Sequence, residues 1–135
     1  MPNAATHIIA GALIGGAASV VIQKKLHYSE RIDVGQVLLT SSSGAVSGRI
    51  PDIIEPATSP NHRAFFHSWF FGCLLGFGIA EFWKSIKRKR EERRVDRIED
   101  ISGTEILQFI GMAVLLAILL HLIMDGFTKK GLPLI

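Results

Sequence analysis

Six side chains that can bind a metal ion lie at the edges of apolar or small-residue segments of this sequence. Four are histidines and two are aspartates: His7, Asp52, His62, His67, His121 and Asp125. Imidazole and carboxylate groups are ligands of zinc and of similar divalent metals. In an apolar protein, each such group costs several kcal/mol when it is buried without a partner. A shared metal site would provide a partner for all six, so we expect them to lie together.

Two pairs of these residues have an informative spacing. His121 and Asp125 are four residues apart, which places both on one face of a helix, one turn apart. This pair is equally compatible with a buried hydrogen bond. His62 and His67 are five residues apart and cannot both point the same way on an ideal helix. We therefore expect one of them to bind metal and the other to orient the substrate or another ligand.

The remaining candidates also have simpler interpretations. Taken alone, His7 is typical of a capping or interfacial histidine. Asp52 follows Pro51 and is typical of a helix cap. His27, beside Tyr28, lies in the connection at the opposite end of the first predicted helix, so we exclude it from the site.

The composition indicates a membrane protein with segregated charges. The chain has 135 residues, which predicts a single domain over residues 1–135. It is 48% hydrophobic, with a mean hydropathy of +0.33, yet 20% of its residues are charged. Many of these charges fall in the run KSIKRKREERRVDRIED at residues 84–100. This run lacks the interleaved aromatics or glycines of a nucleic-acid binder. We interpret residues 84–104 as a charged connection outside the membrane and a candidate surface for a protein partner.

Four apolar segments predict four helices. Residues 106–124 and 65–80 have the length or the flanking aromatics of transmembrane helices. Residues 8–22 and 34–48 either span the membrane or pack against those two. Small residues recur four apart in three segments, at Gly11 and Gly15, Gly44 and Gly48, and Gly72 and Gly76. This spacing allows close helix packing in lipid and predicts a tight bundle.

The direction of the chain then places the candidate ligands at one end. With short connections, the predicted all-α fold is a membrane-embedded up-down four-helix bundle. Of the 15 lysines and arginines, 11 fall at the opposite end. The positive-inside rule places that basic end in the cytoplasm. We therefore expect a multi-pass protein of a bacterial inner (plasma) membrane, with its ligand end facing the periplasm.

Three segments resemble the YdjM-like family of membrane-bound metal-dependent hydrolases. They are PDIIEP at 51–56, HRAFFHS at 62–68 and HLIMDGFTKKGLPLI at 121–135. That family shows an early histidine, a P-D-x-D-H turn, an H-R-x-x-[ST]-H-S segment and a terminal H-x-x-x-D-x-x-T-x-x-G. The matching residues here are His7, Asp52, His62, Arg63, His67, Ser68, His121, Asp125, Thr128 and Gly131.

This chain departs from the family pattern at three positions. Ile54 stands where the family has a second aspartate, and Glu55 stands where it has the following histidine. Phe66 replaces the usual threonine or serine before the second histidine. The loss of a carboxylate would reduce the number of bound metals unless Glu55 serves as an oxygen ligand.

The resemblance also implies a reaction. The family is similar to zinc-dependent phospholipase C proteins, which implies metal-dependent hydrolysis of a phosphoester or ester bond in a membrane lipid or other membrane-associated substrate. It implies one to three Zn²⁺ ions or another divalent metal, and catalytic roles for Asp52, Arg63 and His67. Arg63 would neutralise charge that develops on a phosphoryl oxygen.

Two other classes of protein stay open at this point. One is a non-catalytic membrane scaffold or effector with a structural metal, which the substitution at Ile54 would suit. The other is a small membrane haem protein with paired histidines. The neighbouring carboxylates favour zinc over haem, and the sequence has no C-x-x-C-H motif.

Overall fold

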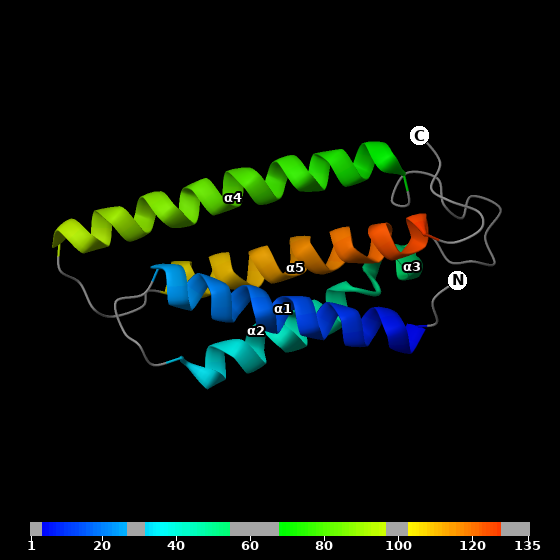
Figure 1. Cartoon of the computed structure of the whole chain (residues 1–135), viewed down its shortest axis with the longest axis horizontal. Coiled ribbons are helices and arrows are strands. Elements are labelled where there is room, and N and C mark those ends of the chain that lie inside the picture. Colours follow the sequence, from blue (N-terminus) through cyan, green and yellow to red (C-terminus); the bar gives the residue numbers. More distant parts are fainter. Residues whose placement is uncertain (1–3, 27–31, 55–67, 97–102, 128–135) are drawn as a thin grey trace.

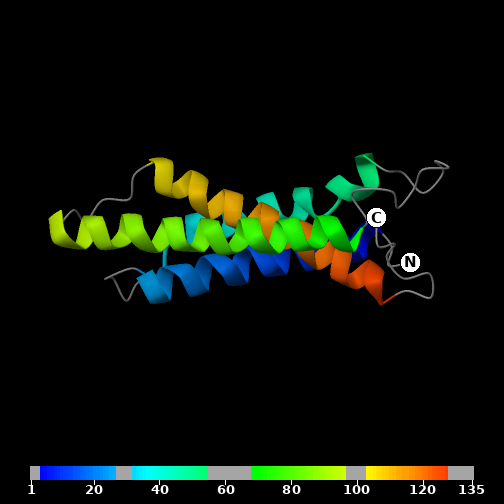
Figure 2. The same ribbon diagram turned by 90° about the horizontal axis from the view of Figure 1, so that it is seen from above.

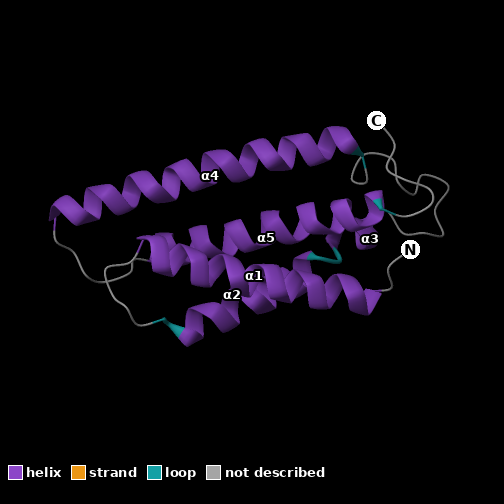
Figure 3. Cartoon of the chain, in the orientation of Figure 1, coloured by secondary structure: helices purple, strands orange, loops and turns teal. Residues whose placement is uncertain are grey.

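The computed structural model describes residues 4–26, 32–54, 68–96 and 103–127. Within these residues the chain forms helices and no strands, which confirms the predicted all-α class (Figure 3). The helices are α1 (Ala4–Leu26), α2 (Val34–Ser47), α3 (Ile50–Ile54), α4 (Trp69–Asp96) and α5 (Gly103–Gly126). The four long helices correspond to the four apolar segments, and α3 is a short helix that the sequence pattern does not predict.

The long helices alternate in direction along the chain (Figures 1 and 2). α1, α2 and α5 each contact the other two, whereas α4 packs mainly against α5. The described part of the chain is therefore a group of three helices with α4 along one side. The alternating directions agree with the predicted up-down order, and the four-helix bundle itself stays a prediction, because α4 packs mainly against α5.

Glycines bring the backbones of α1 and α2 into direct contact. A Cβ atom at Gly11 would overlap the carbonyl of Gly44, and one at Gly44 would overlap the carbonyl of Gly11. Gly15 meets the backbone of Thr40 in the same way and also approaches Ala113 of α5. These contacts confirm that the glycine pairs of α1 and α2 serve close packing.

The glycines of α4 do not have this role in the described part of the chain. A Cβ at Gly72 would meet only the side chain of Leu122, at 3.9 Å, and one at Gly76 would meet nothing within 4 Å. α4 instead packs through larger side chains, because Leu75 lies in a core cluster with Ile118 and Leu122. The prediction of close packing at Gly72 and Gly76 is therefore wrong within the described residues.

α1 and α5 are long and apolar enough to cross a membrane, over residues 4–25 and 103–126. The sequence predicts the span at 106–124, but its other predicted span, residues 65–80, is not among the candidates within the described residues. The apolar part of α4 begins at Trp69 in the structure and is followed by Glu81 and Lys84. That apolar stretch is shorter than the ~20 residues that a bilayer requires.

Candidate metal centre

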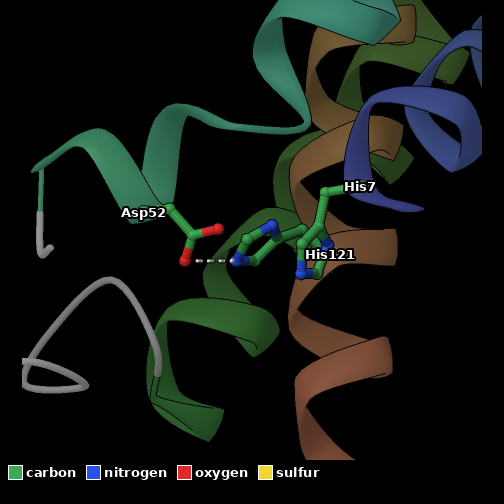
Figure 4. A group of neighbouring side chains, drawn as sticks. All are labelled: His7, Asp52 and His121. Atoms are coloured by element: carbon green, nitrogen blue, oxygen red, sulfur yellow. Dashed lines mark ion pairs between the residues drawn. The ribbon is translucent and has the colours of Figure 1, made fainter. Parts of the chain in front are cut away.

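Three separate elements bring four of the predicted ligands to one end of the helix group. His7 lies near the start of α1, Asp52 lies in α3, and both His121 and Asp125 lie near the end of α5. Figure 4 shows His7, Asp52 and His121 pointing toward one another. The alternating directions of α1, α2 and α5 produce this convergence, as the sequence analysis predicts.

The short helix α3 directs the carboxylate of Asp52 into the group. α2 ends at Ser47, and α3 begins at Ile50 with Pro51 in its first turn, where a missing backbone N–H costs nothing. Pro51 is buried and Asp52 is half-buried, whereas Ile53 and Ile54 are 64% and 50% exposed. Residue 54 is two positions after Asp52 and so lies on nearly the opposite side of the helix.

His121 is held by a hydrogen bond to the end of α2. Its Nδ1 lies 2.7 Å from the carbonyl oxygen of Gly48, and the pair is buried. A carbonyl oxygen can only accept, so Nδ1 carries the proton and donates it. In the neutral ring, the lone pair is therefore on Nε2. This fixed tautomer is the usual arrangement of a histidine that binds metal through its other nitrogen.

Two carboxylates face the Nε2 atom of His121. Asp52 Oδ1 lies at 3.5 Å and Asp125 Oδ2 at 3.8 Å. Both distances exceed the 2.7–3.2 Å of an N–H···O hydrogen bond. A cation among these three atoms would interact favourably with each of them, because imidazole nitrogens and carboxylate oxygens are both metal ligands.

His7 completes the group from α1. Its ring stacks on that of His121, with centroids 3.8 Å apart and planes tilted by 30°. Its Nε2 lies 3.7 Å from Asp125 Oδ1, and both side chains are buried. Its Nδ1 is buried and has no hydrogen-bond partner among the described residues. Imidazole nitrogens and carboxylate oxygens thus share a site that is largely buried.

The spacing of these atoms fits a single divalent cation. His7, Asp52 and His121 each offer one ligand atom, and the three atoms lie within 4.8 Å of one another. Ligand bonds of about 2.1 Å in a tetrahedral zinc site place neighbouring ligand atoms about 3.4 Å apart. The measured separation of His121 Nε2 and Asp52 Oδ1 is 3.5 Å. The donor set and its spacing therefore suit zinc with small adjustments.

The same geometry argues against a haem between these two histidines. Axial ligands bind on opposite faces of a porphyrin, so the two rings must be separated by the macrocycle and the iron. A centroid distance of 3.8 Å is van der Waals contact between the rings. His7 and His121 therefore cannot be the two ligands of one haem in this arrangement.

The other predicted site residues lie outside the described residues. These are Glu55, His62, Arg63, His67 and Thr128. Ser68, which follows His67, is described and is fully buried. Its Oγ accepts a hydrogen bond of 3.1 Å from the backbone N–H of Phe71, so Ser68 caps the start of α4.

Gly48 is a residue of this site that the ligand pattern does not reveal. Its backbone is right-handed helical, with φ −60° and ψ −14°, so its conformation does not require glycine. The requirement is space, because a Cβ would lie 2.6 Å from the carbonyl oxygen of His7. Gly48 thus lets α1 approach while its own carbonyl orients His121. The spacing of the glycines predicts the close approach of the helices. No sequence pattern predicts the hydrogen bond between His121 and the carbonyl of Gly48.

Comparison with known proteins identifies a family. The full chain, residues 1–135, matches the family described as YdjM inner membrane protein. No curated protein and no solved structure matches the chain.

Proposed function

Because this chain belongs to the family of YdjM inner membrane proteins, we propose that it is a membrane-bound metal-dependent hydrolase. Its metal would be held by His7, Asp52 and His121, with Asp125 beside them. The observation that carries the proposal is the environment of His121, whose Nδ1 donates to Gly48 while its Nε2 faces two carboxylates. A buried ion pair alone would bring one N–H within hydrogen-bond distance of one oxygen.

The metal suits hydrolysis because a bound zinc ion acts as a Lewis acid toward water and toward a phosphoryl or carbonyl oxygen. The exposure of the ligands indicates where a substrate would enter. The side chains of His7, His121 and Asp125 are at most 1% exposed, whereas that of Asp52 is 26% exposed. Asp52 thus borders the accessible side of the site. There it could orient a water molecule as well as hold the metal.

The surroundings of the site support a membrane-associated substrate. Ile53 and Ile54 of α3 are exposed beside Asp52, and Phe127, two residues after Asp125, is 88% exposed. Exposed apolar groups beside buried charges suit an amphiphile whose polar group reaches the site while its apolar part stays in lipid. A phosphoester or ester bond of a lipid is the linkage that we propose. His62 and Glu55 are further proposed ligands, and Arg63 and His67 are proposed to act on the substrate.

We also propose that the chain crosses the membrane several times with the ligand end in the periplasm. α2 is rich in serine, but its hydroxyl groups do not oppose insertion. The hydroxyls of Thr40, Ser42, Ser43 and Ser47 each donate to the carbonyl four residues earlier. Polar groups satisfied within their own helix are tolerated in lipid. Together with α1 and α5, α2 can therefore belong to one membrane-embedded bundle.

Metal content tests the site directly. We expect detergent-purified protein to contain stoichiometric zinc by elemental analysis, and we expect His121→Ala to remove it. His27→Ala is the matched control, because His27 is a histidine that the sequence places away from the six candidate ligands. Loss of zinc in both variants, or in neither, would contradict a site built on His121.

Hydrolysis tests the reaction separately. Zinc-loaded protein should release product from a phospholipid or a generic phosphodiester, and Arg63→Ala should lower this rate while leaving zinc content unchanged. If the zinc-loaded protein hydrolyses neither substrate and Arg63→Ala has no cellular effect, the metal is structural and the scaffold interpretation replaces the hydrolase.

A further inference from the structure

The end of the molecule opposite the metal centre carries basic residues on two neighbouring helices. Ile22 of α1 and Ile86 of α4 are buried in one core cluster with Phe109 and Met112 of α5. Both helices become basic immediately after this cluster, with Lys24 and Lys25 in α1 and Lys87 and Arg88 in α4. We call these four residues the basic band. The shared cluster fixes them at one level of the molecule.

The charges of the basic band are exposed and uncompensated. All four residues are exposed, and they form no ion pair within the described part of the chain. Lys84 differs, because its Nζ lies 2.7 Å from Glu81 Oε1. The acidic residues Glu91 and Glu92 come about a turn beyond Lys87 and Arg88. Lys87 and Arg88 thus precede the mixed charges at the end of α4, and Lys24 and Lys25 add two positive charges from α1.

The basic band also lies where the apolar part of the molecule ends. Figure 1 shows α4 continuing beyond the ends of α1 and α5 at this side, and Figure 2 agrees. Just before Lys84, the half-buried ring of Trp83 packs against the cluster that contains Ile86. Tryptophan at the end of an apolar helix is typical of the membrane interface. The basic band follows it by about one turn, at the level of lipid headgroups.

From this placement we infer that the basic band binds the headgroups of anionic phospholipids in the leaflet at that end. Basic residues beside a membrane helix are attracted to an anionic membrane surface. In α4, Lys87 and Arg88 would lie at the level of the lipid phosphates. The mixed-charge part of α4 begins only after them, at Glu91 and Glu92. The part of α4 beyond Arg90 carries both signs and would remain in water, where a protein could bind it.

The two tryptophans of the chain allow a direct test in the intact protein. Trp69 lies at the metal end of α4 and Trp83 at the basic end. Trp69→Phe leaves Trp83 as the single reporter, and Trp83→Phe leaves Trp69. Each variant is placed in phosphatidylcholine vesicles that contain brominated phosphatidylglycerol or brominated phosphatidylcholine, and quenching of its fluorescence is measured. We expect phosphatidylglycerol to be favoured at Trp83 on the order of fivefold, and about equal quenching by the two lipids at Trp69.

Charge variants identify the residues responsible. In the Trp83 reporter, Lys87→Gln with Arg88→Gln should lower the ratio of quenching by phosphatidylglycerol to quenching by phosphatidylcholine, and added salt should lower it further. Glu91→Gln with Glu92→Gln is the matched control and should preserve or increase the preference. Equal quenching of Trp83 by the two lipids at low salt would overturn the inference and leave a protein partner as the explanation of the charged run.

Discussion

The two ends of the helix group both bury polar side chains, but they satisfy them differently. At the basic end, the amide of Gln23 donates to Ser19 Oγ at 3.1 Å and to the carbonyl of Asp33 at 3.2 Å. Its oxygen accepts from the backbone N–H of Asp33 at 2.7 Å. The two bonds with Asp33 link the end of α1 to the start of α2, and the bond to Ser19 lies within α1. The polar groups of this link are matched as donors and acceptors.

At the metal end, the buried nitrogen and oxygen atoms lie farther apart than hydrogen-bonded atoms do. The nitrogen–oxygen distances among His7, His121, Asp52 and Asp125 are 3.5, 3.7 and 3.8 Å. The proposed metal ion would lie among these groups. The difference separates a structural polar contact, whose donors and acceptors pair with one another, from a site that we propose holds a cation. Three substitutions test this distinction.

Asp125→Asn should have the largest effect, at the metal end. An amide keeps the size of the carboxylate, removes its charge and can donate to a histidine nitrogen. We expect zinc affinity to fall by about 100-fold or more, since the ion loses an adjacent negative charge. The metal-free protein should be as stable as the metal-free wild type, or stabilised by about 1 kcal/mol. Zinc titration and thermal unfolding in detergent measure both effects. If Asp125 served instead in a structural ion pair, the same change would cost 3–5 kcal/mol.

Gly48→Ala should have an intermediate effect. The new Cβ would lie 2.6 Å from the carbonyl oxygen of His7, so α1 must move and His7 with it. We expect zinc affinity to fall by about 10–100-fold, together with a stability loss of about 1–3 kcal/mol. Gly11→Ala is the matched control, because it crowds the same contact between α1 and α2 about one turn from His7. We expect this variant to be less stable, with a smaller change in zinc affinity. Equal losses of zinc affinity in the two variants would make Gly48 a packing residue alone.

Gln23→Leu should have the smallest effect and should spare the metal centre. The backbone N–H of Asp33 would lose its 2.7 Å partner, and we expect a loss of about 1 kcal/mol in unfolding free energy. Zinc affinity should stay at the wild-type value, because the link lies at the opposite end of α1 from His7. A fall in zinc affinity as large as that of Gly48→Ala would show that the two ends are not independent.

The helices could be predicted from the sequence because the patterns that indicate them are local. The apolar segment at 106–124 predicts α5 to within a few residues, and Lys24 and Lys25 mark the end of α1. The glycine spacing has the same form in α1 and in α4, yet only α1 uses it for close packing among the described residues. What differs is the surface of the neighbouring helix, which local spacing does not encode.

Part of the candidate site could be predicted from the sequence for a similar reason. His121 and Asp125 share a helix face, and the alternation of helices brings His7 to them. The position of Asp52 depends on α3, a turn of helix that follows from Pro51 and from contact with α5. The hydrogen bond from His121 to Gly48 joins a side chain to a backbone carbonyl, which every residue carries. No residue type could have predicted it.

The order in which the ligands occur along the chain has a consequence for biogenesis. His7 emerges from the ribosome with the first helix, Asp52 follows α2, and His121 with Asp125 belongs to the last described helix. The proposed metal centre therefore could not close until α5 has packed against α1 and α2. A nascent or truncated chain that lacks α5 would expose an incomplete set of ligands to the cell's quality-control proteases. Metal capture would then mark the completed protein, making metal supply a limit on how much mature protein accumulates.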